Sequence, residues 1–167
     1  LGVHRDGGMC ERISVPLGNL YPARELSLDQ AASVEFLSIG AHGVARAAIS
    51  GGIRALVIGA GPIGLGAALF AGIAGVEVTI MDRDPERLSF ALTIAAASKS
   101  IPGGEESLSA VAEATSGDGY DVVIEATGNR VSMEDSCRYV AHGGKLVVVS
   151  VVKENIAFSD PEFHKRE

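Results

Sequence analysis

A glycine-rich turn between a buried strand and a helix constrains this chain more than any other feature of its sequence. Residues 55–58 are apolar and predict a buried strand. The turn that follows carries three glycines with the spacing Gly-x-Gly-x-x-Gly, namely Gly59, Gly61 and Gly64. Residues 77–81 predict a second strand, and Asp82 lies at its end, eighteen residues after the last of these glycines. This arrangement is typical of a nicotinamide or flavin dinucleotide site.

Each glycine meets a separate need of a bound dinucleotide. Gly59 permits the tight turn, Gly61 lets the backbone approach the pyrophosphate, and Gly64 lets the helix pack closely against the sheet. The helix that begins at Pro62 and Ile63 directs unpaired N–H groups and the positive end of its dipole at the phosphates. Proline suits the first helical turn because no donor is needed there.

Asp82 predicts which dinucleotide is preferred. Its carboxylate would accept hydrogen bonds from both ribose hydroxyls of the adenosine half and would repel a 2′-phosphate. NAD is therefore expected over NADP. Arg83 is adjacent and could accept a 2′-phosphate, so NADP stays open as an alternative.

Strands and helices alternate through the rest of the chain. Further strands are expected near 99–101, over 121–125 and over 145–149. A short helix is expected after Ser27, and Val34–Ile49 has helical character that ends at Gly51-Gly52. Further helices are expected at about 62–74, 85–97, 107–115 and 131–141. Alternation of this kind implies parallel strands with right-handed crossovers, and the continuous apolar strands suit a sheet covered on both faces. The predicted fold is a doubly wound α/β (Rossmann) domain with strand order 3-2-1-4-5.

Composition limits the partners. The chain has 167 residues and a formal net charge of -7, which argues against a nucleic-acid partner. Residues 55–76 carry no charge, but six glycines and Pro62 favour a buried strand, turn and helix over a membrane span. Cys10 and Cys137 have no metal or disulfide spacing, so a reducing cytoplasm is the expected compartment.

Residues 1–26 differ from the remainder. Cys10–Val15 alternates in the manner of a strand, and the proline that follows ends it. Ser27 is the expected N-cap of the first helix, with Gln30 at the capping-box position. We expect a short β remnant of another domain over residues 1–26 and a dinucleotide-binding domain over residues 27–167.

With these residues placed, the chain resembles the zinc-dependent medium-chain alcohol and polyol dehydrogenases, and sorbitol dehydrogenase-like members most of all. Besides the glycine turn and Asp82, the resemblance rests on these segments: Gly7–Glu11, Asn19–Pro22, Ala31–Glu35, Asp82–Leu88, Glu125–Asn129, Gly143–Val147 and Phe163–Glu167. Members are about twice this length, and their N-terminal part supplies a zinc-binding cysteine and a His-Glu pair that are absent here. The resemblance therefore implies a fragment: the NAD(P)-binding domain, without its last strand, and a remnant of the catalytic (GroES-like) domain.

The resemblance also assigns roles to residues. Glu35 occupies the position of a late zinc ligand or zinc-proximal acid, although Phe36 replaces the usual proline; a solvated carboxylate at a helix start is the alternative. Arg87 matches a basic position that contacts the adenosine ribose or phosphate. Residues on the nicotinamide side of the cofactor would be Ala126, Thr127, Val149 and Ser150.

For the intact protein, the resemblance implies an oxidoreductase that transfers hydride between nicotinamide and an alcohol, polyol or sugar acid with the help of zinc. It also implies a homodimer or homotetramer. This chain alone contains no catalytic residue by this comparison and is expected to bind cofactor without turnover. Three alternatives remain: a zinc-free quinone oxidoreductase, a Rossmann methyltransferase, whose turn is usually Gly-x-Gly-x-Gly, and a non-enzymatic nucleotide-sensing module.

Overall fold

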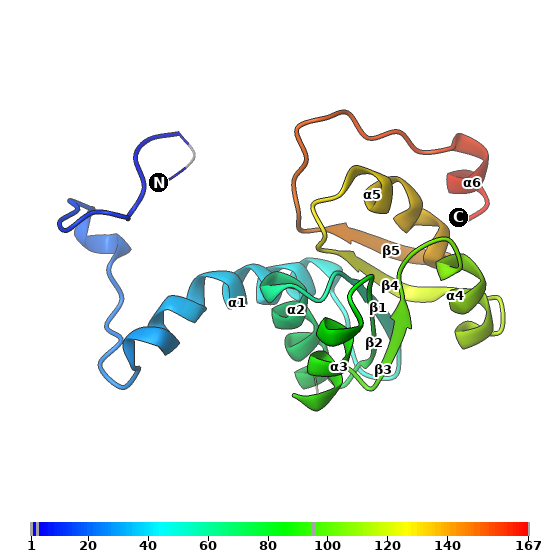
Figure 1. Cartoon of the computed structure of the whole chain (residues 1–167), viewed down its shortest axis with the longest axis horizontal. Helices are drawn as coiled ribbons and strands as arrows, with labels where there is room; N and C mark the ends of the chain where they lie inside the picture. Colours follow the sequence, from blue (N-terminus) through cyan, green and yellow to red (C-terminus); the bar gives the residue numbers. More distant parts are fainter. Residues whose placement is uncertain (1, 3, 95, 167) are drawn as a thin grey trace. The chain divides into compact units, whose positions relative to one another are not determined.

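The computed structural model describes residues 2, 4–94 and 96–166, and it divides the chain into two compact units, Leu1–Ala32 and Ser33–Glu167. The second unit contains a parallel sheet of five strands in the order β3-β2-β1-β4-β5 (Figure 1). The strands are β1 (Arg54–Ile58), β2 (Glu77–Asp82), β3 (Lys99–Pro102), β4 (Tyr120–Glu125) and β5 (Val140–Val148). The α/β fold and the strand order predicted from the sequence are confirmed.

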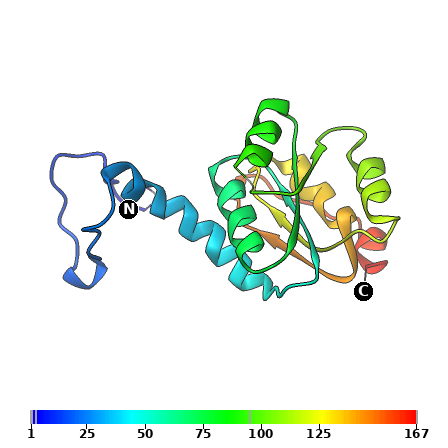
Figure 2. The same ribbon diagram turned by 90° about the horizontal axis from the view of Figure 1, so that it is seen from below.

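Helices cover both faces of this sheet. They are α1 (Leu28–Ala47), α2 (Pro62–Ile73), α3 (Pro85–Thr93), α4 (Ser107–Thr115), α5 (Arg130–Ser136) and α6 (Asp160–His164), with short 3-10 turns η1 (Leu17–Asn19) and η2 (Cys137–Tyr139). One core packs α2 and α3 against the sheet through residues such as Ala67, Ile80 and Leu88. A second core packs α4 and η2 against the opposite face through Val111 and Tyr139. Figure 2 shows the sheet between these two layers.

Helix starts are fixed by local caps. Ser27 and Gln30 form the expected capping box, because each side chain accepts from the other residue's backbone N–H, over 2.9 and 3.2 Å. Asp84 caps α3 by accepting from the backbone N–H groups of Glu86 and Arg87, and Asn129 caps α5. The loops that follow β2 and β4 therefore each end at a capped helix start.

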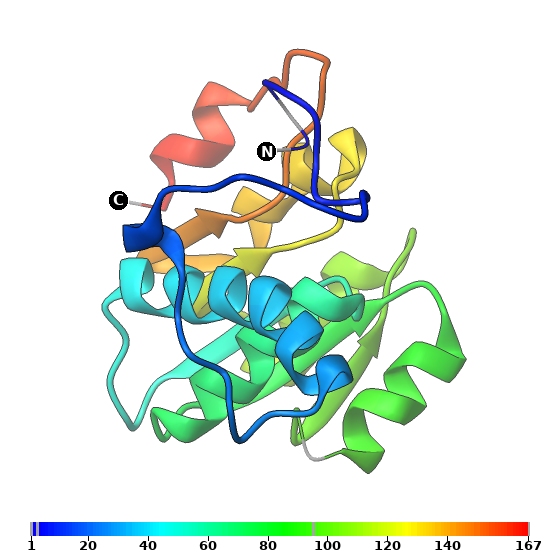
Figure 3. The same ribbon diagram turned by 90° about the vertical axis from the view of Figure 1, so that its left-hand side faces the viewer.

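Helix ends differ from expectation. Helix α1 ends at Ala47, before Gly51-Gly52, because Ala48 turns into the left-handed region with φ 49°. Helix α3 ends at Thr93 rather than near 97, and residue 95 lies outside the described residues. The helix expected over 131–141 is split into α5 and η2, and β5 begins as early as Val140 with a register shift against β4. Helix α6 lies beside η2 at the β5 edge of the sheet (Figure 3).

The strand expected at Cys10–Val15 is absent from this structure. In the first unit, the described residues before α1 form η1 and loops but no strand, and Cys10–Val15 is irregular. The physical reason is that a strand needs a neighbour to satisfy its backbone groups, and the described part of this unit offers none. Among the described residues, no helix combines the length and the apolarity needed to cross a membrane. The uncharged stretch 55–76 is β1 followed by α2, as expected.

Candidate functional site

The glycine turn joins β1 to α2. Gly59 has φ 101°, in the left-handed region that favours glycine, and its N–H donates to Met81 O over 2.7 Å. A Cβ at Gly64 would lie 1.8 Å from Gly59 O, so no side chain fits between turn and helix. By contrast, a Cβ at Gly61 would meet nothing within 4 Å. The turn is therefore tightly packed underneath at Gly64 and open above Gly61, where a phosphate is expected.

Asp82 is held at the end of β2 by the same turn. Its Oδ2 accepts from the backbone N–H of Ala60 over 2.6 Å, and its Oδ1 accepts from that of Asp84 over 2.9 Å. The N–H of Gly103, after β3, donates to Asp82 O over 2.8 Å. The ends of β1, β2 and β3 are thus tied together at one residue, through its carboxylate and its backbone carbonyl.

A cleft of about 660 Å³ opens above these strand ends. Of the residues singled out from the sequence, the structure brings nine into its wall: Gly59, Gly61, Pro62, Ile63, Asp82, Arg83, Arg87, Ala126 and Thr127. Gly64, Val149 and Ser150 do not line it. Gly64 lies beneath the turn, Val149 packs against the core on the α2 face, and Ser150 bonds to Glu125. The cleft lies at the carboxyl ends of parallel strands, where open α/β sheets bind their ligands.

Other wall residues were not singled out from the sequence. They are Ile58, Met81, Gly103, Gly104, Glu105, Ser107, Asn129, Val131, Ser132, Asp135 and Tyr139. The strand-end rule could have found Gly103, Gly104 and Asn129, because each follows a strand closely. Asp135 and Tyr139 lie in α5 and η2, more than one helical turn beyond Asn129. No local sequence pattern predicts that they reach the cleft.

Arg83 and Arg87 at the cleft are exposed, and Arg87 forms a solvent-exposed ion pair with Asp84. Arg87 Nε lies 3.6 Å from Asp84 Oδ2, with the two side chains 59% and 46% exposed. Such an ion pair contributes little to stability and leaves the guanidinium available to a ligand phosphate.

Glu125 is a buried carboxylate at the end of β4 that is surrounded by donors. Its relative exposure is 0%. Oε1 accepts from Thr127 N over 3.1 Å, from Thr127 Oγ1, and from Ser132 Oγ over 3.0 Å, and Oε2 accepts from Ser150 Oγ. The carboxylate therefore ties the loop after β4, the start of α5 and the chain after β5 to one point. Within the sheet, Ile58 pairs with Glu125, so this cluster adjoins the strand end that enters the glycine turn.

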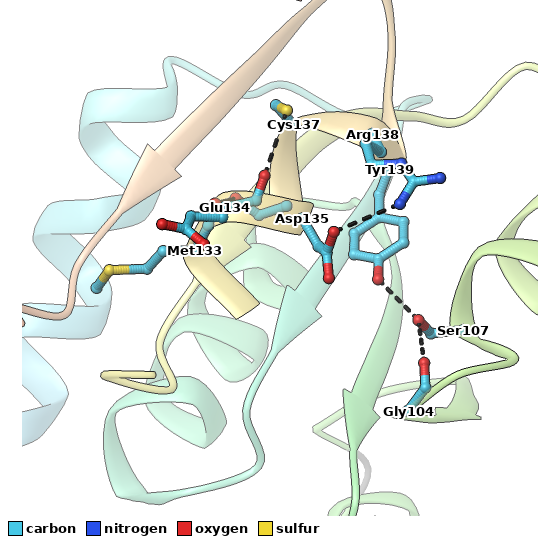
Figure 4. A network of polar contacts seen from close by, with 9 residues as sticks. Gly104, Ser107, Met133, Glu134, Asp135, Cys137, Arg138 and Tyr139 are labelled. Atoms are coloured by element: carbon cyan, nitrogen blue, oxygen red, sulfur yellow. Dashed lines mark hydrogen bonds and ion pairs between the residues drawn. The ribbon is translucent and has the colours of Figure 1, made fainter. Parts of the chain in front are cut away.

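A second polar network lies at the far wall (Figure 4). Ser107 Oγ donates to Gly104 O over 2.7 Å and lies 2.7 Å from Tyr139 Oη. Burial raises the pKa of Tyr139, while its bond to Ser107 acts in the opposite direction. Arg138 Nη1 lies 3.4 Å from Asp135 Oδ1, and Cys137 Sγ donates to Glu134 O.

The residues present do not fit a zinc ion. Glu35 is exposed on α1, and across residues 2, 4–94 and 96–166 no group of three His, Cys, Asp or Glu side chains could hold a metal. Zinc sites in proteins use three or four such ligands. The described residues of this chain therefore provide no zinc site on their own.

The strand order reverses between β1 and β4, and the cleft lies at the carboxyl ends of these strands. These two features define a doubly wound, Rossmann-type α/β protein. The chain belongs to the zinc-binding dehydrogenase family, whose model matches residues 62–167. This confirms the resemblance noted from the sequence and favours a dehydrogenase over a methyltransferase.

Individual relatives support the same family. L-galactonate-5-dehydrogenase of Escherichia coli K12 is 41% identical over 167 residues, which are 100% of this chain and 49% of that protein. Sorbitol dehydrogenase of Bacillus subtilis 168 is 30% identical over 131 residues, 78% of this chain and 37% of that protein. The crystal structure of galactitol-1-phosphate dehydrogenase from Escherichia coli shares the fold, with a TM-score of 0.86 and 24% identity over 99% of this chain and 48% of that one. The chain thus spans half or less of the length of these relatives.

Proposed function

We propose that this chain is the NAD-binding domain of a zinc-dependent alcohol or polyol dehydrogenase. The observation that carries the proposal is the cleft, in which the open glycine turn, the N-terminus of α2 and Asp82 converge. A cleft that offers backbone N–H groups at one point and a carboxylate at the next matches a pyrophosphate joined to a ribose. The position of Gly61, where a Cβ would meet only open space, supports a phosphate at that point.

In this proposal, the residues of the chain bind and orient the cofactor. Gly61, Pro62 and Ile63 hold the pyrophosphate, with Gly59 and Gly64 shaping the turn beneath it. The Asp82 carboxylate accepts hydrogen bonds from the ribose hydroxyls. Arg83 and Arg87 flank the ribose. On the nicotinamide side the proposed residues are Ala126 and Thr127, which line the cleft, and Val149 and Ser150, which lie outside its wall. When bound, the cofactor supplies hydride transfer, and the protein positions it and excludes water.

NAD is the proposed cofactor over NADP. The Asp82 carboxylate already accepts two backbone N–H groups, and a 2′-phosphate would bring like charges together beside it. Arg83 lines the same cleft and is the feature that would favour NADP.

The remaining features of the intact protein are also proposals. They are oxidation of a small alcohol, polyol or sugar acid, a zinc ion to which Glu35 contributes, a homodimer or homotetramer, a cytoplasmic setting, and an origin of residues 1–26 in a catalytic domain. By the same proposal this chain alone binds cofactor without turnover. A zinc-binding cysteine and a His-Glu pair upstream in the parent reading frame would support the zinc enzyme over a quinone oxidoreductase.

Fluorescence titration of the chain with NADH and NADPH, with S-adenosylmethionine as a third ligand in calorimetry, tests the proposal. We expect saturable NADH binding, weaker NADPH binding and no S-adenosylmethionine binding. Preferential binding of S-adenosylmethionine would contradict the dinucleotide assignment. Alcohol oxidation by this polypeptide alone would contradict the expected lack of turnover.

A further inference from the structure

Tyr139, Ser107 and Gly104 form a chain of hydrogen bonds, here called the hydroxyl relay, at the far wall of the cleft. The donors and acceptors in this chain are fixed. Ser107 has one hydroxyl proton, and Gly104 O can only accept, so the 2.7 Å bond between them uses that proton. Ser107 must then accept in its 2.7 Å bond with Tyr139, and the Tyr139 phenol must donate. Because its proton points at Ser107, Tyr139 Oη can only accept a hydrogen bond from a group in the cleft.

Asp135 adds a second acceptor to the same wall. One of its oxygens, Oδ1, faces Arg138 Nη1 at 3.4 Å, which is long and leaves Oδ2 outside that contact. The Asp135 side chain is 43% exposed and lines the cleft together with Tyr139 and Ser107. Burial raises the pKa of Tyr139, so the phenol keeps its proton near neutral pH and the relay keeps its direction.

The position of this wall determines which part of a dinucleotide it would meet. If the phosphates lie at the N-terminus of α2 and the ribose at Asp82, the base extends away from both. The wall beyond Asp82 is formed by Gly103 and Ser107 after β3 and by Asp135 and Tyr139, with Tyr139 hydrogen-bonded to Ser107. The base therefore meets a surface that presents acceptors.

We propose that Tyr139 and Asp135 select purine nucleotides that carry an exocyclic amino group at position six, as adenine does. Hypoxanthine and guanine carry a carbonyl at that position, and this oxygen cannot donate to either acceptor. Sites built to hydrogen-bond a polar group discriminate strongly against analogues that lack it. This inference rests on the proposed function, because it assumes that the cleft holds an adenine dinucleotide.

Calorimetric titration with AMP and IMP tests it, with NADH binding measured in parallel. We expect the wild-type chain to bind AMP about tenfold more tightly than IMP. Tyr139→Phe keeps the bond between Ser107 and Gly104. In this variant the ratio of AMP affinity to IMP affinity should fall by a factor of about three. In Asp135→Asn the new amide can donate to a carbonyl, so AMP and IMP should bind about equally.

Matched controls are Tyr21→Phe and Asp118→Asn, whose side chains lie outside the cleft and are largely exposed. Both should keep the wild-type ratio of AMP to IMP affinity. A variant that is merely less stable should bind both nucleotides more weakly by the same factor, so the ratio of the two affinities would not change. Equal binding of AMP and IMP to the wild type, or an unchanged ratio in both cleft variants, would overturn the inference while NADH binding still upholds the proposed function. Absence of binding by NADH, AMP and IMP would overturn both.

Discussion

The backbone N–H of Ala60 donates to Asp82 Oδ2 over 2.6 Å, so the glycine turn and the acid at the end of β2 form one unit. The carboxylate is thereby oriented before any ligand arrives, which lowers the entropy lost on binding. The bond also makes the turn depend on the acid, because Ala60 is 3% exposed and its N–H needs a partner.

Asp82→Asn should weaken NADH binding about thirtyfold and reduce or reverse the preference over NADPH. The asparagine oxygen can still accept from Ala60, whereas its NH2 group cannot accept from Asp84, and the charge-assisted bonds to the ribose are lost. Fluorescence titration measures both affinities. Asp118→Asn serves as the control, because that side chain is 75% exposed and lies outside the cleft. An unchanged NADH affinity in Asp82→Asn would count against a ribose at this carboxylate.

Gly64→Ala should destabilise the fold by about 2–3 kcal/mol and weaken cofactor binding, because its Cβ would lie 1.8 Å from Gly59 O and would force the turn apart. Gly72→Ala, in the same helix, has nothing within 4 Å of its Cβ and should stabilise the protein by about 0.5 kcal/mol. Urea denaturation compares the two. Similar unfolding midpoints for both variants would contradict the close packing beneath the turn.

Glu125→Ala should cost about 3 kcal/mol, because it leaves the donors of Thr127, Ser132 and Ser150 without their shared acceptor. Ser150→Ala removes one donor and should cost about 1 kcal/mol. In a double-mutant cycle, the combined loss should be smaller than the sum of the two single losses. Strict additivity would mean that the two side chains do not interact in solution.

Stability should fall as the pH rises above about 9. Burial raises the pKa of the Cys137 thiol and of the Tyr139 phenol, so the folded protein holds these two protons more tightly than the unfolded chain. Unfolding therefore releases protons once the pH exceeds the unfolded values of about 8.5 for a thiol and about 10 for a phenol, and the loss continues toward the folded values. Urea denaturation at pH 7, 9 and 10.5 measures the slope. Cys137→Ala should lessen the early part of it, and a slope identical to that of the wild type would refute the contribution of the thiol.

The sheet could be predicted from the sequence because β1, β4 and β5 contain continuous apolar runs and the turns are marked by glycine, proline and caps. Ser27 with Gln30 is the clearest case, since both hydrogen bonds of the expected capping box are present. Residues 1–26 could not be predicted in this way. An alternating pattern at Cys10–Val15 indicates a strand only where another strand is available to pair with it.

For the candidate site, the sequence predicted those residues that lie next to strand ends. Gly61 and Asp82 were found because their roles depend on local backbone geometry. Tyr139 and Asp135 were missed because they reach the cleft through the packing of α5 and η2 on the sheet, which no local pattern encodes. Val149 and Ser150 follow a strand end as expected, yet they lie outside the wall of the cleft, because Val149 packs into the core and Ser150 turns to Glu125.

The most direct test of the proposed binding site is a nuclear magnetic resonance titration of the ¹⁵N-labelled chain with NADH. If the cofactor lies over the glycine turn, the largest amide shifts should fall on Gly59, Gly61, Ile63 and Asp82. Residues at the opposite end of the sheet, such as His142 and Gly143, should stay unchanged. Shifts centred on that opposite end, or no shifts at saturating NADH, would contradict the assignment of this cleft to the dinucleotide.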